Sequence, residues 1–278
     1  MEENFIKLRG LNIFTRTIGD GEPLVFLHGG PGGEHRYFLP HLEELSKDFK
    51  LVFYDQRGCG RSEESTDKAY SIQEEIETLE ELRTHLGIEK LNLVGESWGS
   101  MLALSYACAY PTHVNKLFLT AAVGAVLDGY LGFEQELLSR LSDKDKSDLE
   151  KVMERLRNEE ATVEEVFSII DPYYVFSVES LHKKSVTKAN NEVNMIVGED
   201  IKKHYDLSNE SRKLEHIPIV VAQGENDIIT PDKLQEVLIK YLPHTKLEII
   251  KECGHWSVIE KPTVLMDLIK RFFSEYIS

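Results

Sequence analysis

The chain has 278 residues and a formal net charge of −16, from 48 acidic and 32 basic residues. This length can bury a sizeable core, and the acidic balance argues against nucleic acid or an anionic membrane as the main partner. No apolar run approaches the ~20 residues of a membrane span, and three cysteines do not suggest a disulfide framework. Residues 1–4 lack a signal-peptide pattern, so we expect a cytoplasmic protein.

Short apolar runs alternate with amphipathic stretches along most of the chain. Alternation around Gly10 predicts an antiparallel hairpin at one edge of a sheet. The predicted strands, in chain order, are 5–9, 11–16, 24–27, 51–54, 91–94, 114–119, 217–222 and 246–250. The predicted helices are 37–47, 72–86 (with a capping box formed by Ser71 and Glu74), one from 98, 231–242 and about 263–276. This order predicts an α/β fold: a mostly parallel sheet with helices on both faces.

The segment Gly95-Glu96-Ser97-Trp98-Gly99 has the pattern of a nucleophile elbow. An apolar strand at 91–94 precedes it and a helical stretch from Trp98 follows it, which is the strand–turn–helix context that exposes a nucleophile above a sheet. The flanking glycines allow close approach of the backbone and strain at the serine. We therefore expect Ser97 to be a catalytic nucleophile.

An acyl-transfer serine also needs a histidine base and an acid that orients it, and on this fold type the chain order is Ser, acid, His. Asp227 and His255 each fall in a loop directly after a predicted strand, in that order. Glu225 and Asp232 are close enough in sequence to compete with Asp227 for the acid's role.

The glycine-rich loop His28-Gly29-Gly30-Pro31-Gly32-Gly33 follows the strand at 24–27. It lacks the Lys-Ser or Lys-Thr of a phosphate-binding loop and the dinucleotide-binding pattern of glycines. We expect it to supply one oxyanion donor, the Gly30 N–H, with the second from the residue after the nucleophile, Trp98.

Three motifs together resemble the proline iminopeptidases, a family of α/β-hydrolase serine aminopeptidases. They are residues 28–33 (HGGPGG), 55–62 (DQRGCGRS) and 95–100 (GESWGS), and the resemblance covers about 5–110 and 217 to the end. It implies Ser97, Asp227 and His255 as the triad, release of an N-terminal residue from short peptides with a free N-terminus, and no metal or organic cofactor. An esterase or lactonase on the same triad is the alternative.

The resemblance also implies a helical cap domain inserted into the α/β-hydrolase core. Residues 124–214 break the strand–helix alternation and are rich in charge, so we expect the cap there and the catalytic core in 1–123 and 215–278. A buried ammonium group needs a carboxylate partner, and the resemblance suggests glutamates for it. Glu225 and Glu199 are the expected amine-binding residues.

Overall fold

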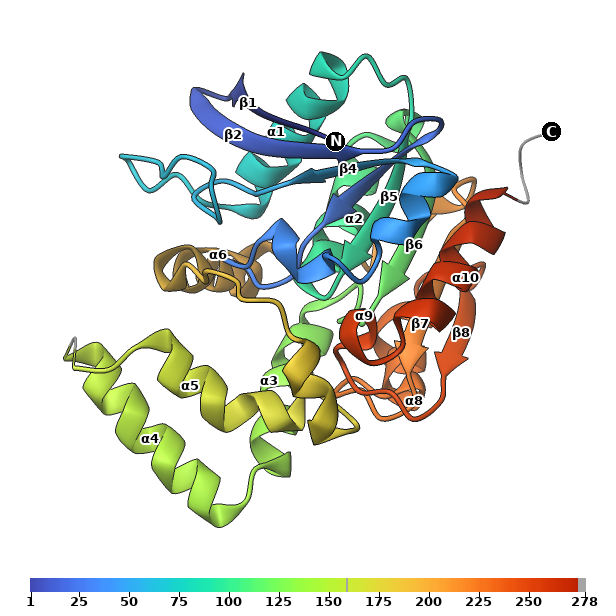
Figure 1. Cartoon of the computed structure of the whole chain (residues 1–278). Coiled ribbons are helices and arrows are strands. Elements are labelled where there is room, and N and C mark those ends of the chain that lie inside the picture. The colour runs from blue at the N-terminus through green and yellow to red at the C-terminus, as the bar shows by residue number, and fades with distance from the viewer. Residues whose placement is uncertain (159, 275–278) are drawn as a thin grey trace.

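The computed structural model describes residues 1–158 and 160–274, which form one eight-stranded sheet in the order β1-β2-β4-β3-β5-β6-β7-β8 (Figure 1). β1 pairs antiparallel with β2, and β2 with β4, while every pair from β4 to β8 is parallel. The strands are β1 (Glu2–Leu8), β2 (Leu11–Ile18), β3 (Pro23–Leu27), β4 (Lys50–Tyr54), β5 (Leu91–Glu96), β6 (Val114–Thr120), β7 (Ile219–Gly224) and β8 (Lys246–Ile250). The predicted edge hairpin and the mostly parallel sheet are therefore confirmed.

Helices cover both faces of the sheet, which explains why its central strands are apolar on both sides. One face packs on α1 and α2 through residues such as Leu79 and Leu102. The other packs on the closing helix α10 through Leu265 and Ile269, which lie in one buried cluster with Phe118 of β6.

The helices fall into two groups along the chain. In the core are α1 (Ile72–His85), α2 (Trp98–Ala109), α8 (Pro231–Leu234), α9 (Ser257–Glu260) and α10 (Pro262–Ser274), with short 3-10 turns η1 (His35–Phe38), η2 (Glu43–Lys47) and η3 (Pro111–His113) and a π-helical turn η6 (Gln235–Ile239). Between β6 and β7 come α3 (Leu127–Arg140), α4 (Asp143–Arg157), α5 (Val163–Ile170), α6 (Asn191–His204) and α7 (Ser211–Leu214), with turns η4 (Asp171–Tyr173) and η5 (Val178–Lys183).

The residues between β6 and β7 are helical, and we call residues 124–214 the cap segment. Helices α4 and α5 lie side by side and project away from the sheet (Figure 1). Helix α6, in contrast, packs on the core, because Val197 and Ile201 are buried in the same cluster as α1 and α2. Within the described residues, no helix is long and apolar enough to cross a membrane.

Three local predictions differ from the structure, and the expected end of the last helix lies outside the described residues. The helix expected over 37–47 is two 3-10 turns, since Pro40 between them has no N–H and cannot continue a helix. Ser71 caps α1 by accepting the Glu74 N–H at 3.1 Å, but the Glu74 carboxylate pairs with Arg9 at 2.9 Å rather than closing a capping box. The helix expected over 231–242 is α8 followed by a π-helical turn, and α10 is described only to Ser274, so the expected end at 276 lies outside the described residues.

Candidate active site

Three loops at the carboxyl ends of β5, β7 and β8 bring Ser97, Asp227 and His255 together. The Ser97 Oγ lies 2.9 Å from His255 Nε2, and His255 Nδ1 lies 2.8 Å from Asp227 Oδ1. Asp227 is fully buried and His255 is 2% exposed, whereas Ser97 is partly exposed. The arrangement links a partly accessible hydroxyl to a shielded imidazole–carboxylate pair, which is the geometry of nucleophile, base and orienting acid.

The turn that carries Ser97 requires both flanking glycines. Ser97 has φ 52° and ψ −117°, a left-handed backbone that an L residue rarely adopts. A Cβ on Gly99 would lie 2.0 Å from the Leu27 carbonyl oxygen, and one on Gly95 would lie 2.4 Å from the Gly99 carbonyl oxygen. Only hydrogen fits at either position, so the motif's glycines are explained by close packing of the turn against β3.

The two expected oxyanion donors lie on either side of the elbow's packing contact: Trp98 follows Ser97 in the chain, and Gly30 follows Gly29, whose added Cβ would lie 3.3 Å from Ser97 Cβ. Trp98 is the first residue of α2, where N–H groups have no acceptor within the helix, and Gly30 lies in the loop after β3 at φ +128°. No hydrogen bond from either N–H to an acceptor is recorded among the described residues. Neither N–H group therefore has a competing acceptor among the described residues, and Trp98 lies at the positive end of the α2 dipole.

A buried network holds the glycine-rich loop against the elbow. The Trp98 indole donates to Gln56 at 2.8 Å, the Gln56 amide donates to the His28 carbonyl at 3.0 Å, and the Gln56 N–H lies 3.1 Å from His28 Nε2. Burial lowers the pKa of His28, which keeps this imidazole neutral and able to accept. His28 thus has a structural role beside the reaction centre.

The loop of residues 55–62 is fixed by Asp55, which lies in a buried group with Glu34 and His35 whose ligand atoms fall within 4.8 Å of one another. Asp55 Oδ1 accepts the His35 N–H at 2.9 Å and lies 2.7 Å from His35 Nδ1, while Oδ2 accepts the Arg61 N–H at 2.9 Å. The Glu34 carboxylate binds Arg36. Because both carboxylates already have partners, this group is explained as a loop support rather than a metal site.

The cap segment holds the acid's loop. The Arg140 guanidinium, at the end of α3, donates to the carbonyls of Asn226 at 3.0 Å and Asp227 at 2.6 Å. Asp227 Oδ1 also accepts the Ile229 N–H at 3.1 Å. Asp227 Oδ2 is buried and has no hydrogen-bond partner among the residues described, so the charge of this carboxylate is directed mainly at His255.

The cap segment also holds the histidine's loop, through a short strap at residues 174–177. The N–H groups of His255 and Trp256 donate to the Tyr174 carbonyl at 2.7 and 3.2 Å. The Glu260 carboxylate, 8% exposed, accepts the Gly254 N–H at 2.7 Å on one side and strap N–H groups on the other, Phe176 at 3.0 Å and Ser177 at 2.9 Å. One buried carboxylate therefore joins the strap to the histidine's loop.

The environment of His255 raises the pKa of its imidazole. Burial alone would lower its pKa, but the charge of Asp227 and the hydrogen bond to it outweigh burial and raise the pKa above the usual 6.5. Aromatic side chains enclose the ring: Phe133 from α3 at 4.8 Å between centroids and Tyr174 at 5.6 Å. The base is shielded from solvent and stabilised in its charged form.

Neither expected amine-binding glutamate lies with the triad. Glu199 is on α6, its side chain 60% exposed and paired with Lys202 at 3.1 Å. Glu225 is exposed on the loop before Asp227, and its carboxylate accepts the Glu252 N–H at 3.4 Å. The structure therefore does not bring either glutamate into contact with the triad: Glu199 is exposed on α6, and Glu225 lines a surface hollow with Arg140 and Phe176.

Sequence reasoning missed Glu96, Arg140 and Glu260. Glu96 sits inside the elbow motif, 3% exposed and beside the serine, and its signal was an acidic residue at the end of a strand buried throughout. Arg140 and Glu260 bind backbone groups distant in sequence, a pattern that carries no local signal.

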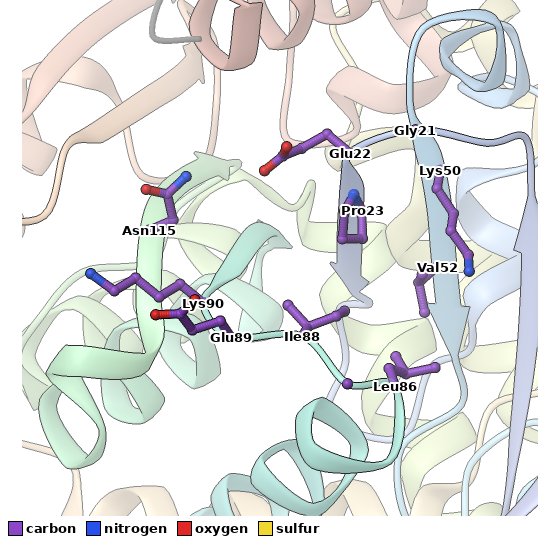
Figure 2. Close-up of a pocket in the computed structure, with 11 residues that line it drawn as sticks. Gly21, Glu22, Pro23, Lys50, Val52, Leu86, Ile88, Glu89, Lys90 and Asn115 are labelled. Atoms are coloured by element: carbon purple, nitrogen blue, oxygen red, sulfur yellow. The ribbon is translucent and has the colours of Figure 1, made fainter. Parts of the chain in front are cut away.

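A cavity of about 640 Å³ lies at the other end of the sheet (Figure 2). Its walls include Pro23 and Lys50, the first residues of β3 and β4, whereas Ser97 follows the last residue of β5. Glu22, at its rim, binds the Asn92 amide at 2.8 Å, and none of the lining residues is a serine, cysteine or histidine. Since parallel α/β sheets place their chemistry at the carboxyl ends of strands, the triad end is the candidate site.

Comparison with known proteins agrees with this architecture. The sequence profile of the alpha/beta hydrolase fold matches residues 22–262. The chain is 28% identical to a proline iminopeptidase of Lactobacillus crispatus, an alignment that covers 99% of this chain and 98% of the relative. The resemblance to proline iminopeptidases thus extends over the full length.

Solved structures of hydrolases with different descriptions have the same fold. An alpha/beta fold family hydrolase from Bacillus anthracis str. Sterne superposes with a TM-score of 0.78 at 21% identity, covering 99% of this chain and 98% of that one. A thermophilic esterase from Thermogutta terrifontis superposes with a TM-score of 0.72 at 19% identity, covering 99% of both chains. On the profile match and these superpositions, the chain belongs to the alpha/beta hydrolase fold family.

Proposed function

We propose that this protein is a serine aminopeptidase that releases an N-terminal residue, proline or another apolar one, from short peptides. The observation that carries the serine mechanism is the Ser97–His255–Asp227 chain of contacts at 2.9 and 2.8 Å. The full-length resemblance to proline iminopeptidases supports the choice of substrate.

The first half-reaction forms an acyl-enzyme. His255 Nε2 takes the Ser97 hydroxyl proton as Oγ bonds to the carbonyl carbon of the first residue, and Asp227 stabilises the imidazolium. The N–H groups of Gly30 and Trp98 stabilise the oxyanion, each worth on the order of 10²–10³ in rate. The C–N bond then breaks, and His255 returns the proton to the departing amine.

The second half-reaction repeats these roles with water as the nucleophile. His255 removes a proton from water as its oxygen attacks the acyl carbon, and Ser97 Oγ leaves with that proton. We propose that the 124–214 segment acts as a cap over this reaction, because its residues Phe133 and Tyr174 pack on the His255 ring. Such a cover excludes bulk water from the oxyanion.

The second candidate is a carboxylesterase or lactonase on the same triad. It is favoured by the exposure of Glu199 and Glu225, because neither expected carboxylate lies in a buried site that would select a free ammonium group. The rivals differ in whether turnover needs a free amine.

The test is a panel of aminoacyl arylamides, free and N-acetylated, beside a simple aryl ester. We expect cleavage of Pro-, Ala- or Leu-arylamide that disappears on acetylation and in Ser97→Ala, with Ser139→Ala, on the exposed surface of α3, as the matched control. Ester cleavage indifferent to a free amine would assign the protein to the esterases or lactonases instead. Full activity in Ser97→Ala would overturn the serine mechanism.

A further inference from the structure

Glu96 is a buried acidic side chain that the mechanism above does not use. It is the last residue of β5, directly before the nucleophile, and is 3% exposed. No lysine or arginine of the described chain forms an ion pair with it. Burying a carboxyl group without a cationic partner costs free energy of folding. The presence of Glu96 beside the serine therefore needs an explanation.

The carboxyl group lies at the reaction centre. The Cβ that Gly29 lacks would sit 2.1 Å from Glu96 Oε2 and 3.3 Å from Ser97 Cβ. Both atoms thus border the same glycine, next to the predicted oxyanion donor Gly30. In an aminoacyl substrate the α-nitrogen is only about 2.5 Å from the carbonyl carbon that Ser97 attacks. A carboxylate that holds this nitrogen must therefore stand within a few ångströms of the nucleophile, as Glu96 does.

Aromatic groups next to Glu96 suit a cation. The Tyr37 hydroxyl is buried next to the Glu96 carboxyl: burial, the charge of Glu96 and hydrogen bonding to it together raise the pKa of Tyr37. The Tyr37 ring contacts Trp256 at 6.5 Å between centroids, and Trp256 contacts Tyr174 at 5.1 Å. Aromatic rings attract ammonium groups through their negative faces. A hydroxyl that donates to Glu96 still has oxygen lone pairs with which to accept from an ammonium group.

The local charge balance is also incomplete without a cation. Burial and the nearby charge of Asp227 raise the pKa of Glu96 to about 7, while His255 opposes them. The cationic groups near the two acids are the His255 imidazolium, the Arg140 guanidinium on the Asp227 carbonyl at 2.6 Å, and Lys184 over the Trp256 ring at 4.6 Å. None of the three forms an ion pair with Glu96 within the described chain. A bound ammonium would stabilise the ionised form of Glu96.

We propose that Glu96, assisted by the Tyr37 hydroxyl, binds the α-ammonium group of the substrate and so selects peptides with a free N-terminus. This inference rests on the proposed aminopeptidase function. It assigns to the elbow the specificity role that Glu199 and Glu225, on the surface, do not fill.

The experiment compares each aminoacyl aryl ester with its des-amino counterpart, such as the alanyl and propionyl esters of one phenol. The two acyl groups differ only in the ammonium, so the ratio of their kcat/KM values isolates its recognition. In Glu96→Gln, which keeps shape and removes charge, we expect this ratio to fall about 10–100-fold. Glu225→Gln and Glu199→Gln are the matched controls, and their ratios should stay at the wild-type value.

Three outcomes would overturn the proposal. The first is an unchanged ratio in a Glu96→Gln variant that still reacts with a fluorophosphonate probe at the wild-type rate. The second is a loss of the ratio in Glu225→Gln or Glu199→Gln instead. The third is a wild-type enzyme that does not prefer the free amine, which would refute the aminopeptidase function as well. If Glu96→Gln does not fold, Tyr37→Phe provides the readout: a fall of about 3–10-fold supports the site, and an unchanged ratio contradicts it.

Discussion

Glu75 gives a quantitative test of the electrostatics beneath the triad end of the sheet. It lies on the core face of α1, 1% exposed, and its Oε2 has no hydrogen-bond partner among the residues described. Burial raises the pKa of this carboxyl to about 8, despite the opposing charge of Arg57. The folded protein therefore keeps Glu75 protonated at neutral pH.

The sign of the effect on stability follows from proton counting. In the unfolded chain Glu75 ionises near pH 4.5, whereas in the folded protein it ionises near 8. Between these values the folded state binds more protons, so the free energy of unfolding falls as pH rises, and the loss is complete above pH 8. At about 1.4 kcal/mol per pKa unit, the part of this loss between pH 5 and pH 8.5 is about 4 kcal/mol.

The perturbation is Glu75→Gln, which cannot ionise, and the assay is urea unfolding at pH 5 and pH 8.5. The difference in free energy of unfolding between the variant and wild type is measured at each pH, so that the pH-independent cost of the amide cancels. We expect this difference to shift in favour of the variant by about 4 kcal/mol from pH 5 to pH 8.5. Glu81→Gln, exposed on the same helix, should show no such change, since exposed charges are well screened. An improvement below about 1 kcal/mol would refute the reasoning.

Two further predictions concern the histidine's loop. Glu260→Gln replaces one carboxylate oxygen and so leaves at least one N–H of Gly254, Phe176 or Ser177 without an acceptor. The loss should cost about 1–3 kcal/mol in urea unfolding. A misplaced histidine should also lower kcat about 10–100-fold, and wild-type kcat would contradict this. The charge and hydrogen bond of Asp227 raise the pKa of His255, and the proposed mechanism needs the neutral imidazole. We therefore expect kcat/KM for a neutral aryl ester to fall as pH drops through a midpoint above 6.5. A pH–rate profile whose acid limb is centred below pH 6 would exclude His255 as the base.

The sequence was informative where a side chain's position depends on its immediate neighbours. Ser97 lies in a strand–turn–helix motif whose glycines signal the close packing seen at Leu27. The loops after two apolar runs placed Asp227 and His255 near it, because parallel strands end at one edge of the sheet. Such local patterns can be interpreted from the sequence without knowledge of tertiary contacts.

The sequence was uninformative where tertiary packing decides. Glu199 and Glu225 were chosen by resemblance and loop position, yet one faces solvent from α6 and the other turns toward the Glu252 N–H. Glu96 was hidden in a variable position of the motif. The π-helical turn after α8 also has no distinctive sequence signal, since the apolar spacing there fits an ordinary helix.

In the proposed mechanism, the strap at residues 174–177 couples access to Ser97 with the position of its histidine base. Any opening that lifts it breaks the bonds from the His255 and Trp256 N–H groups to Tyr174 and removes the strap from Glu260. The same opening takes the Tyr174 ring off the imidazole. An open molecule would therefore have a loosened base, and acyl transfer would wait until the strap is seated again. Water that enters while the strap is raised would therefore meet a Ser97 whose histidine base is displaced.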